Sequence, residues 1–132
     1  MPTFLDTHAW VWWVTEDPRL PPKIAAGIQR TARSEGVWLS AISIWEVANL
    51  HERGRVRFDQ PLRDWLEQAT APPLVTRMRI SPSVAAEVAA LPPSFHRDPA
   101  DRIIVATARV LGADLLTNDT RIIESGVVPT IS

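Results

Sequence analysis

Short apolar segments alternate with longer helical patterns along the whole chain, and this alternation limits the fold more than any other feature. Five segments have strand character: residues 3–5, 37–40, 74–80, 114–117 and 127–131. Most of these segments contain consecutive apolar residues rather than a strict alternation, which is typical of strands that are buried on both faces. Strands of this kind, separated by helices, form parallel sheets. The sequence therefore predicts an α/β protein whose parallel sheet is covered by helices on both faces.

Six segments between or beside these strands have helical character. They are residues 9–14, 23–34, 43–53, 62–70, 82–91 and 99–111. The segment 9–14 is apolar on all sides, so we expect it to be a buried helix. Gly54 and Gly112 follow two of the helices as stop signals, and three proline pairs mark breaks between elements. The sequence contains no repeat or linker, and we expect residues 1–132 to form a single domain.

The composition excludes several classes of protein. With 45% hydrophobic and 22% charged residues the chain is typical of a soluble globular protein, and no apolar run reaches the roughly 18 residues that span a bilayer. The N-terminus does not have the pattern of a signal peptide, and zero cysteines exclude disulfides and thiolate metal sites. We therefore expect a cytoplasmic protein. The net charge of −1 argues against binding nucleic acid by basicity alone, but not against presenting phosphate to metal ions.

Four acidic residues hold similar positions relative to the predicted elements. Asp6 follows the first strand, and Asp119 lies two residues past the fourth. Glu46 lies in about the first turn of the helix that follows residues 37–40, and Asp101 lies in the first turn of the helix at 99–111. In an open parallel sheet the carboxyl ends of strands share one edge with the N-termini of the following helices, and ligands bind there. The sequence therefore predicts that the four acids converge in one pocket.

Carboxylates that converge in this way point to a particular chemistry. They raise one another's pKa values and need a cation to remain ionised together. Mg²⁺ and Mn²⁺ are hard cations that accept a few carboxylates and fill their other positions with water or phosphate. Such ions can activate water and stabilise the leaving oxygen of a phosphodiester. The predicted chemistry is phosphodiester hydrolysis.

Each acid also has a purely structural interpretation. Asp6 and Asp98 could cap helices, and for Asp98 the cap is the favoured role. Asp101 could complement the helix dipole, and Asp119 could belong to a turn. Glu46 is hardest to explain structurally, because its neighbours are apolar and an unpaired carboxylate among them would be costly. The group of acids is therefore stronger evidence for a site than any single member.

Four short motifs occur in a fixed order along the chain. They are Phe4-Leu-Asp6-Thr7-His8, Ser43-Ile-Trp-Glu46-Val-Ala, Asp98-Pro-Ala-Asp101-Arg-Ile-Ile-Val-Ala-Thr-Ala and Leu115-Leu-Thr117-Asn-Asp119. Together they closely resemble the motifs of PIN-domain nucleases, specifically the VapC-type toxins of bacterial type II toxin–antitoxin systems. The resemblance covers nearly the whole chain. It implies a three-layer α/β/α sandwich around a mainly parallel sheet of four or five strands.

The resemblance also implies a function for individual residues and partners. It implies a metal-dependent endoribonuclease whose Mg²⁺ or Mn²⁺ ligands and catalytic groups are Asp6, Glu46, Asp101 and Asp119. Thr7 and Thr117 match hydroxyl positions beside the first and last acid and are expected to support them, whereas the role of Asp98 stays open. The implied partners are an RNA substrate and a cognate antitoxin protein that blocks the acidic site. The implied assembly is a homodimer that forms a heterotetramer or larger complex with the antitoxin.

Other functions remain open on the residues alone. A phosphatase-like hydrolase with an aspartyl nucleophile needs a second acid two residues after the first, where this chain has His8, and it needs a downstream lysine that is missing. A non-catalytic binding module on the same fold is a second alternative. A DNA or structure-specific nuclease is a third, because the acids act on phosphate and not on the sugar.

Several other residues have two interpretations each. The chain has six tryptophans, which are Trp10, Trp12, Trp13, Trp38, Trp45 and Trp65. We expect most of them in the core, while exposed members would suit a dimer or antitoxin groove or stack on bases. The three histidines show no zinc-binding spacing. Arg102 and Arg121 adjoin the acidic motifs and either guide phosphate or pair with the acids.

Overall fold

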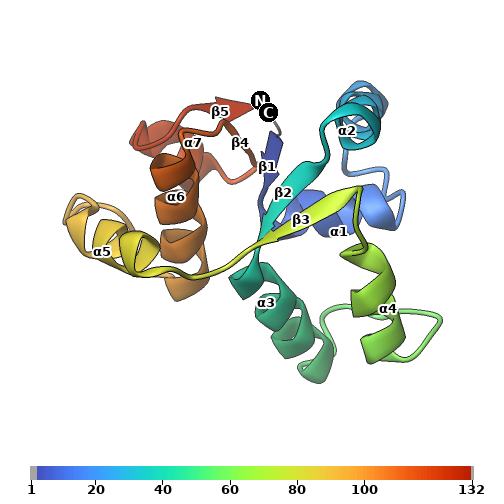
Figure 1. Ribbon diagram of the computed structural model, residues 1–132. Coiled ribbons are helices and arrows are strands. Elements are labelled where there is room, and N and C mark those ends of the chain that lie inside the picture. Colours follow the sequence, from blue (N-terminus) through green and yellow to red (C-terminus); the bar gives the residue numbers. More distant parts are fainter. Residues whose placement is uncertain (1–2, 132) are drawn as a thin grey trace.

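The computed structural model describes residues 3–131 (Figure 1). Its strands are β1 (Thr3–Leu5), β2 (Val37–Ser40), β3 (Val75–Met78), β4 (Leu115–Leu116) and β5 (Thr130–Ile131). Its helices are α1 (Thr7–Val14), α2 (Pro22–Ser34), α3 (Ala41–Glu52), α4 (Leu62–Ala69), α5 (Pro82–Ala90), α6 (Pro99–Leu111) and α7 (Thr120–Ser125). None of these helices is long and apolar enough to cross a lipid bilayer.

The five strands form one sheet in the order β3-β2-β1-β4-β5, and every pair is parallel. The central strand β1 places Leu5 beside Leu39 of β2 on one side and Phe4 beside Leu115 of β4 on the other. The chain first builds outward from β1 through β2 to β3, and then crosses to the other side of β1 for β4 and β5. The strand order therefore reverses between β1 and β4, which is where ligands bind in open α/β sheets.

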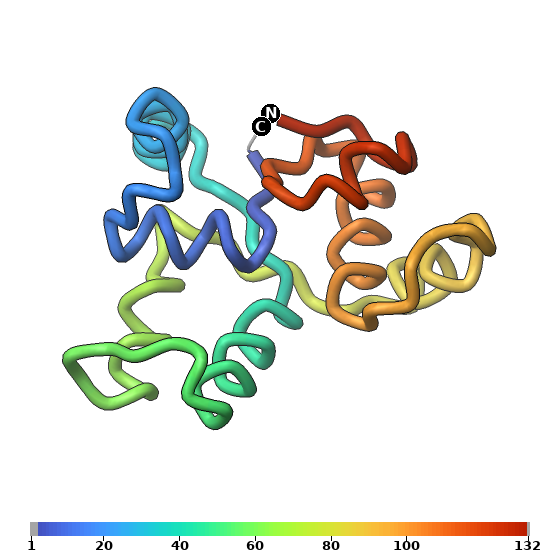
Figure 2. Tube along the Cα trace, turned by 180° about the vertical axis from the view of Figure 1, so that it is seen from behind, coloured from blue at the N-terminus to red at the C-terminus, as the bar shows by residue number. Residues whose placement is uncertain are grey.

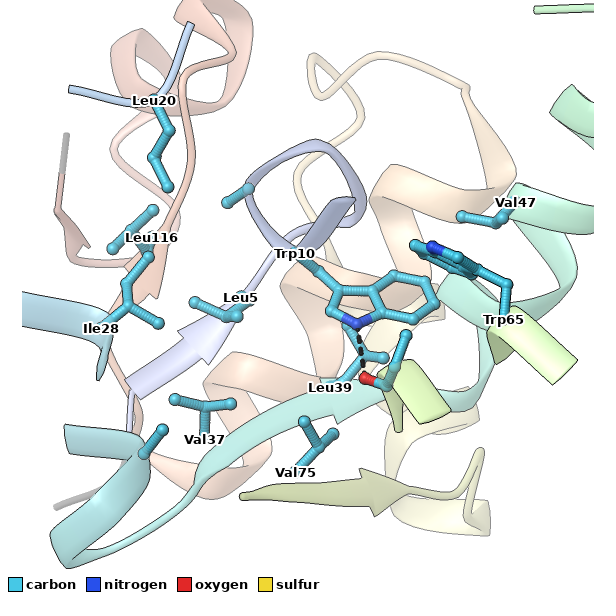
Figure 3. Close-up of a cluster of buried hydrophobic side chains, with 13 residues drawn as sticks. Leu5, Trp10, Leu20, Ile28, Val37, Leu39, Val47, Trp65, Val75 and Leu116 are labelled. Atoms are coloured by element: carbon cyan, nitrogen blue, oxygen red, sulfur yellow. Dashed lines mark hydrogen bonds between the residues drawn. The ribbon is translucent and has the colours of Figure 1, made fainter. Parts of the chain in front are cut away.

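Alternate side chains of the strands pack into two separate cores, so the predicted three-layer sandwich is confirmed. Leu5, Leu39 and Leu116 point into one core, which Figure 3 shows, together with residues of α1, α2 and α4. Their neighbours Phe4 and Leu115 point into the other core, which α6, α7 and the segment that follows α5 cover. Figures 1 and 2 show the same division from opposite sides, with α1, α2 and α4 on one side of the sheet and α5, α6 and α7 on the other.

Trp10 fixes the position of α1 beneath the sheet. Its side chain is fully buried, its indole ring packs 5.2 Å from that of Trp65, and its Nε1 donates a hydrogen bond of 2.9 Å to the backbone oxygen of Ala69. Figure 3 shows this bond as a dashed line between α1 and α4. The prediction that this helix is buried on all sides is wrong, because residues 11–14 are only partly buried. One side of α1 therefore remains available to line a pocket.

Caps decide where the other helices near the site begin. Helix α3 begins at Ala41, two residues earlier than predicted, because the Ser40 hydroxyl caps it by accepting the N–H of Ile42 at 3.2 Å. Glu46 consequently lies in the second turn of α3 and not in the first. Helix α6 has the predicted bounds and ends at Gly112 in the left-handed conformation. The six-residue helix α7 was not predicted, and Asp119 caps it.

Candidate active site

The structure brings all four predicted acids to one pocket of about 380 Å³ at the carboxyl edge of the sheet. The acids are Asp6, Glu46, Asp101 and Asp119, and the same pocket is lined by Asp98. Asp6 follows β1 and Asp119 follows β4, so these two acids stand on the two sides of the switch in strand order. Glu46 comes from α3 and Asp101 from the first turn of α6. The pocket, from here on the acidic pocket, is thus assembled from four separate segments of the chain.

Asp6 is the most tightly held of these acids. Its side chain is only 6% exposed. One carboxylate oxygen accepts the N–H of Ala9 at 2.8 Å and the other accepts the hydroxyl of Thr117 at 2.5 Å. Burial raises the pKa of Asp6, although these two hydrogen bonds lower it in part. The Thr117 hydroxyl also accepts the N–H of Asp119 at 3.0 Å, so this threonine connects the first and last acids.

Asp101 lies between a histidine and a helix start. The N–H of Asp101 donates to the carboxylate of Asp98 at 2.9 Å, so Asp98 caps α6 as the sequence indicates. Its own carboxylate lies 2.7 Å from Nε2 of His96. Burial raises the pKa of Asp101, the hydrogen bond with His96 lowers it, and the negative charges of Asp98 and Asp119 raise it further. His96 could not be singled out from the sequence, because its approach to Asp101 depends on the path of the loop between α5 and α6.

Asp119 is paired with Arg121. The guanidinium of Arg121 lies 3.2 Å from the carboxylate of Asp119 and 3.5 Å from that of Asp101, and the N–H of Arg121 donates to Asp119 at 2.8 Å. Burial raises the pKa of Asp119, but the hydrogen bonds from Arg121 outweigh it and hold this pKa below its usual value. Of the two roles considered for Arg121, the structure therefore shows the ion pair. Arg102 has neither role, because its guanidinium donates to backbone oxygens of Val88, Phe95 and His96.

Glu46 makes no salt bridge in the described part of the chain. Burial raises its pKa, the Thr7 hydroxyl lowers it in part, the negative charges of Asp101 and Asp98 raise it again, and the nearby His8 lowers it in part. Thr7 is itself buried and hydrogen-bonded to Ser43 at 2.8 Å, which joins the start of α1 to the first turn of α3. Thr7 thus helps to fix the helix that carries Glu46.

The chemistry of these side chains fits a hard divalent cation. The donors are all oxygen atoms, and three of the four acids have raised pKa values, which means that their charges are incompletely compensated. Within residues 3–131, however, no three Asp, Glu, His or Cys side chains are already close enough together to hold one ion. The reason is visible in the contacts, since Asp101 is turned to His96 and Asp119 to Arg121. These carboxylates would have to leave those partners to share a cation.

One tryptophan is among the residues that line the acidic pocket. Trp12 of α1, with His8 and Arg19, lines the acidic pocket. The guanidinium carbon of Arg19 lies 5.0 Å from the centre of the Trp12 ring. From the sequence, Trp12 could belong to the core or to a binding surface. Arg19 could not be identified from the sequence, because its position depends on the loop between α1 and α2.

A three-layer α/β/α sandwich with acids gathered at its switch point defines a class of protein, and comparison with known families agrees with this. The PIN domain family profile matches residues 3–126. The chain therefore belongs to the PIN-domain family.

Individual members of the family, and solved structures of the same fold, are also similar to this chain. The chain is 41% identical over 118 residues to a protein named Ribonuclease VapC22 from Mycobacterium tuberculosis (strain ATCC 25618 / H37Rv), a match that covers 89% of this chain and 87% of the relative. The fold is similar to that in the crystal structure of VapBC2 from Rickettsia felis bound to a DNA fragment from their promoter, with a TM-score of 0.73, 14% identity and coverage of 99% and 98% of the two chains. It is also similar to a toxin–antitoxin complex from Klebsiella pneumoniae, with a TM-score of 0.64, 20% identity and coverage of 98% and 96%.

Proposed function

We propose that this chain is a Mg²⁺- or Mn²⁺-dependent endoribonuclease that hydrolyses RNA phosphodiester bonds. The proposed metal-binding and catalytic residues are Asp6, Glu46, Asp101 and Asp119. The observation that carries the proposal is that four acids from four segments line one pocket at the switch point of a PIN fold. The 41% identity to a protein named as a ribonuclease supports RNA as the substrate.

The residues of the acidic pocket have different proposed roles in the reaction. When bound, Mg²⁺ or Mn²⁺ would activate the attacking water and stabilise charge on the leaving oxygen. Asp6 is positioned by Thr117 and by the N–H of Ala9, so its carboxylate needs little reordering to act. Glu46 can accept a proton from the attacking water at its carboxylate, because burial raises its pKa and makes the carboxylate a stronger base. The exposed guanidinium of Arg121 is placed to contact the phosphate when Asp119 turns away from it.

The test is cleavage of RNA by the purified protein with Mg²⁺, with Mn²⁺ and with excess EDTA. We expect cleavage only with the metal ions, and undiminished cleavage in EDTA would reject the proposed mechanism. Substitution of any of the four acids by its amide should reduce cleavage at least about a hundredfold, as for the loss of one electrostatic catalytic group. Asp114→Asn is a matched control, because Asp114 is exposed and lies at the opposite end of β4. Asp98→Asn should reduce cleavage less, because asparagine still caps a helix.

We further propose that the chain acts in the cytoplasm as the toxin of a toxin–antitoxin pair, as a single PIN domain over residues 1–132 that forms a homodimer. The similarity of its fold to chains in toxin–antitoxin complexes supports this assignment. Its expression should slow growth, and a cognate antitoxin encoded beside it should relieve this by binding directly at the acidic pocket. Healthy growth with abundant, folded wild-type protein would contradict the toxin role. Light scattering checks the dimer, and one cooperative melting transition checks the single domain.

A further inference from the structure

A second hollow adjoins the acidic pocket and differs from it in character. It is small, about 50 Å³, and it is mostly apolar, with Leu20 and Ile24 among its lining residues. Trp12, Arg19 and Asn118 line both hollows. We call these three the rim residues. A ligand that crosses the rim would therefore have one end among carboxylates and the other against an apolar surface.

Trp12 differs from the other two tryptophans of α1 in the hydrogen bonding of its indole N–H. Trp10 donates its indole N–H to the backbone oxygen of Ala69, and Trp13 donates its own to Gln29 at 3.2 Å. The indole N–H of Trp12 has no hydrogen-bond acceptor in the part of the chain that the structure describes, and its side chain is partly exposed. Trp12 therefore packs against the same core as Trp10, while its partly exposed side chain also lines the rim.

Arg19 is held over this ring by an ion pair with Asp17. The Arg19 guanidinium makes two hydrogen bonds to Asp17, at 2.8 and 3.1 Å, and this pairing lowers the pKa of Asp17 to about 2. Its guanidinium carbon lies 5.0 Å from the Trp12 ring centre, while 67% of its side chain remains exposed. His8 lies against the same ring, with 5.8 Å between the ring centres and an angle of 56°. The rim thus combines an indole face with a planar cation.

We propose that the rim residues bind the nucleobase of a nucleotide next to the phosphodiester that is cut. Indole faces and guanidinium planes are the surfaces on which single-stranded bases stack. The exposed amide of Asn118 can both donate to and accept from the edge of such a base. With 14 basic against 15 acidic residues, this chain has no net positive charge with which to hold RNA, so local contacts of this kind can add to those between the phosphate and the metal ions.

The inference rests on the proposed function, and the experiment separates the two. A short single-stranded RNA that spans a mapped cut is labelled with 2-aminopurine at one position at a time. It is bound to the Asp119→Asn protein with Mg²⁺, so that binding is measured without turnover. We expect fluorescence quenching by stacking at one position beside the cut. Trp12→Leu should remove this quenching and weaken binding about tenfold, which corresponds to about 1.4 kcal/mol and lies within the range for one stacked base.

An RNA that lacks the base at the quenched position completes a double-mutant cycle. This abasic RNA should bind about tenfold more weakly to the parent protein, and Trp12→Leu should then cause little further loss. Trp12→Phe should largely restore binding because it restores an aromatic face. Trp45→Leu is the matched control, since Trp45 is 57% exposed on α3 and lines neither hollow.

Each result decides a different point. If the wild type cuts RNA but no position is quenched, the base site is refuted and the nuclease stands. Equal loss of affinity for intact and abasic RNA in Trp12→Leu would likewise refute stacking and assign Trp12 a structural role. If the wild type cuts no RNA with any divalent metal, the proposed function fails and the base site fails with it.

Discussion

Replacing Thr117 by valine tests the hydrogen bond that holds the first acid. Valine has the shape of threonine, so Thr117→Val leaves no cavity and removes only the hydroxyl. That hydroxyl donates to Asp6 at 2.5 Å, and the two side chains are 1% and 6% exposed. Water therefore cannot easily replace the lost donor. The substitution should weaken the metal-free protein and disturb the position of Asp6 at the same time.

The size of the effect follows from these contacts. A hydrogen bond to a charged group contributes about 1.5–3 kcal/mol, and Asp6 would keep only the N–H of Ala9 as a donor. The N–H of Asp119 also loses its acceptor, but it is partly exposed and water can satisfy it. The free energy of unfolding should therefore fall by about 2–3 kcal/mol at pH 7. At roughly 4 °C per kcal/mol for a chain of this length, the melting temperature should fall by about 8–12 °C.

Urea denaturation and thermal melts in EDTA measure this change. Thr117→Ser keeps the hydroxyl and loses only a methyl group, so it should cost about 1 kcal/mol. In an Asp6→Asn background the effect of Thr117→Val should also fall to about 1 kcal/mol, because the bond is then neutral. A valine variant within about 0.5 kcal/mol of wild type, the range of unremarkable surface substitutions, would show that the bond to Asp6 does not exist in solution.

Two other substitutions test the charges of the acidic pocket. Glu46→Gln should stabilise the metal-free protein above about pH 5. The pKa of Glu46 is raised in the folded protein, so the stability of the wild type is greatest below the pKa of the unfolded chain and falls as the pH rises through the pKa of the folded protein. If the difference in urea midpoint between wild type and Glu46→Gln is the same at about pH 5 and about pH 7.5, this prediction is wrong. At a hundred times its Kd, Mn²⁺ should stabilise wild type by about 2.7 kcal/mol and this variant less. Arg121→Gln should tighten Mn²⁺ binding severalfold in calorimetry by freeing Asp101 and Asp119, and weaker binding would refute competition with the metal.

The layers of the fold could be predicted because the strands carry their pattern locally. Phe4 and Leu5 are both apolar, and in the structure they enter opposite cores, as expected for a strand that is buried on both faces. The burial of α1 was predicted wrongly, since an apolar helix is compatible with a core on all sides or with a core on one side and a pocket on the other. Helix α7 was missed because six residues give too little periodicity to detect.

The meeting of the acids could also be predicted, because topology alone brings strand ends and helix starts to one edge. The partners of the acids could not. His96 and Arg19 reach the site from loops, where no periodic pattern fixes the direction of a side chain. Arg121 was identified as a residue near the site, but its choice between phosphate and carboxylate depends on a distance that only the structure supplies. Sequence therefore predicted which residues meet, and not which of them are already paired.

The acids also show that capping and catalysis need not be alternative roles. Asp6 caps α1 with one carboxylate oxygen, and Asp119 caps α7 in the same way. In each case the second oxygen is left for side chains of the site, Thr117 for Asp6 and Arg121 for Asp119. The helix start favours a negative charge nearby, which offsets part of the cost of gathering acids in one pocket. Asparagine keeps the capping oxygen and loses the charge, so Asp119→Asn should reduce cleavage at least about a hundredfold with little loss of stability, whereas alanine should lose the cap as well. Asp6→Asn should reduce cleavage to a similar extent but also cost stability, because it weakens the buried bond with Thr117.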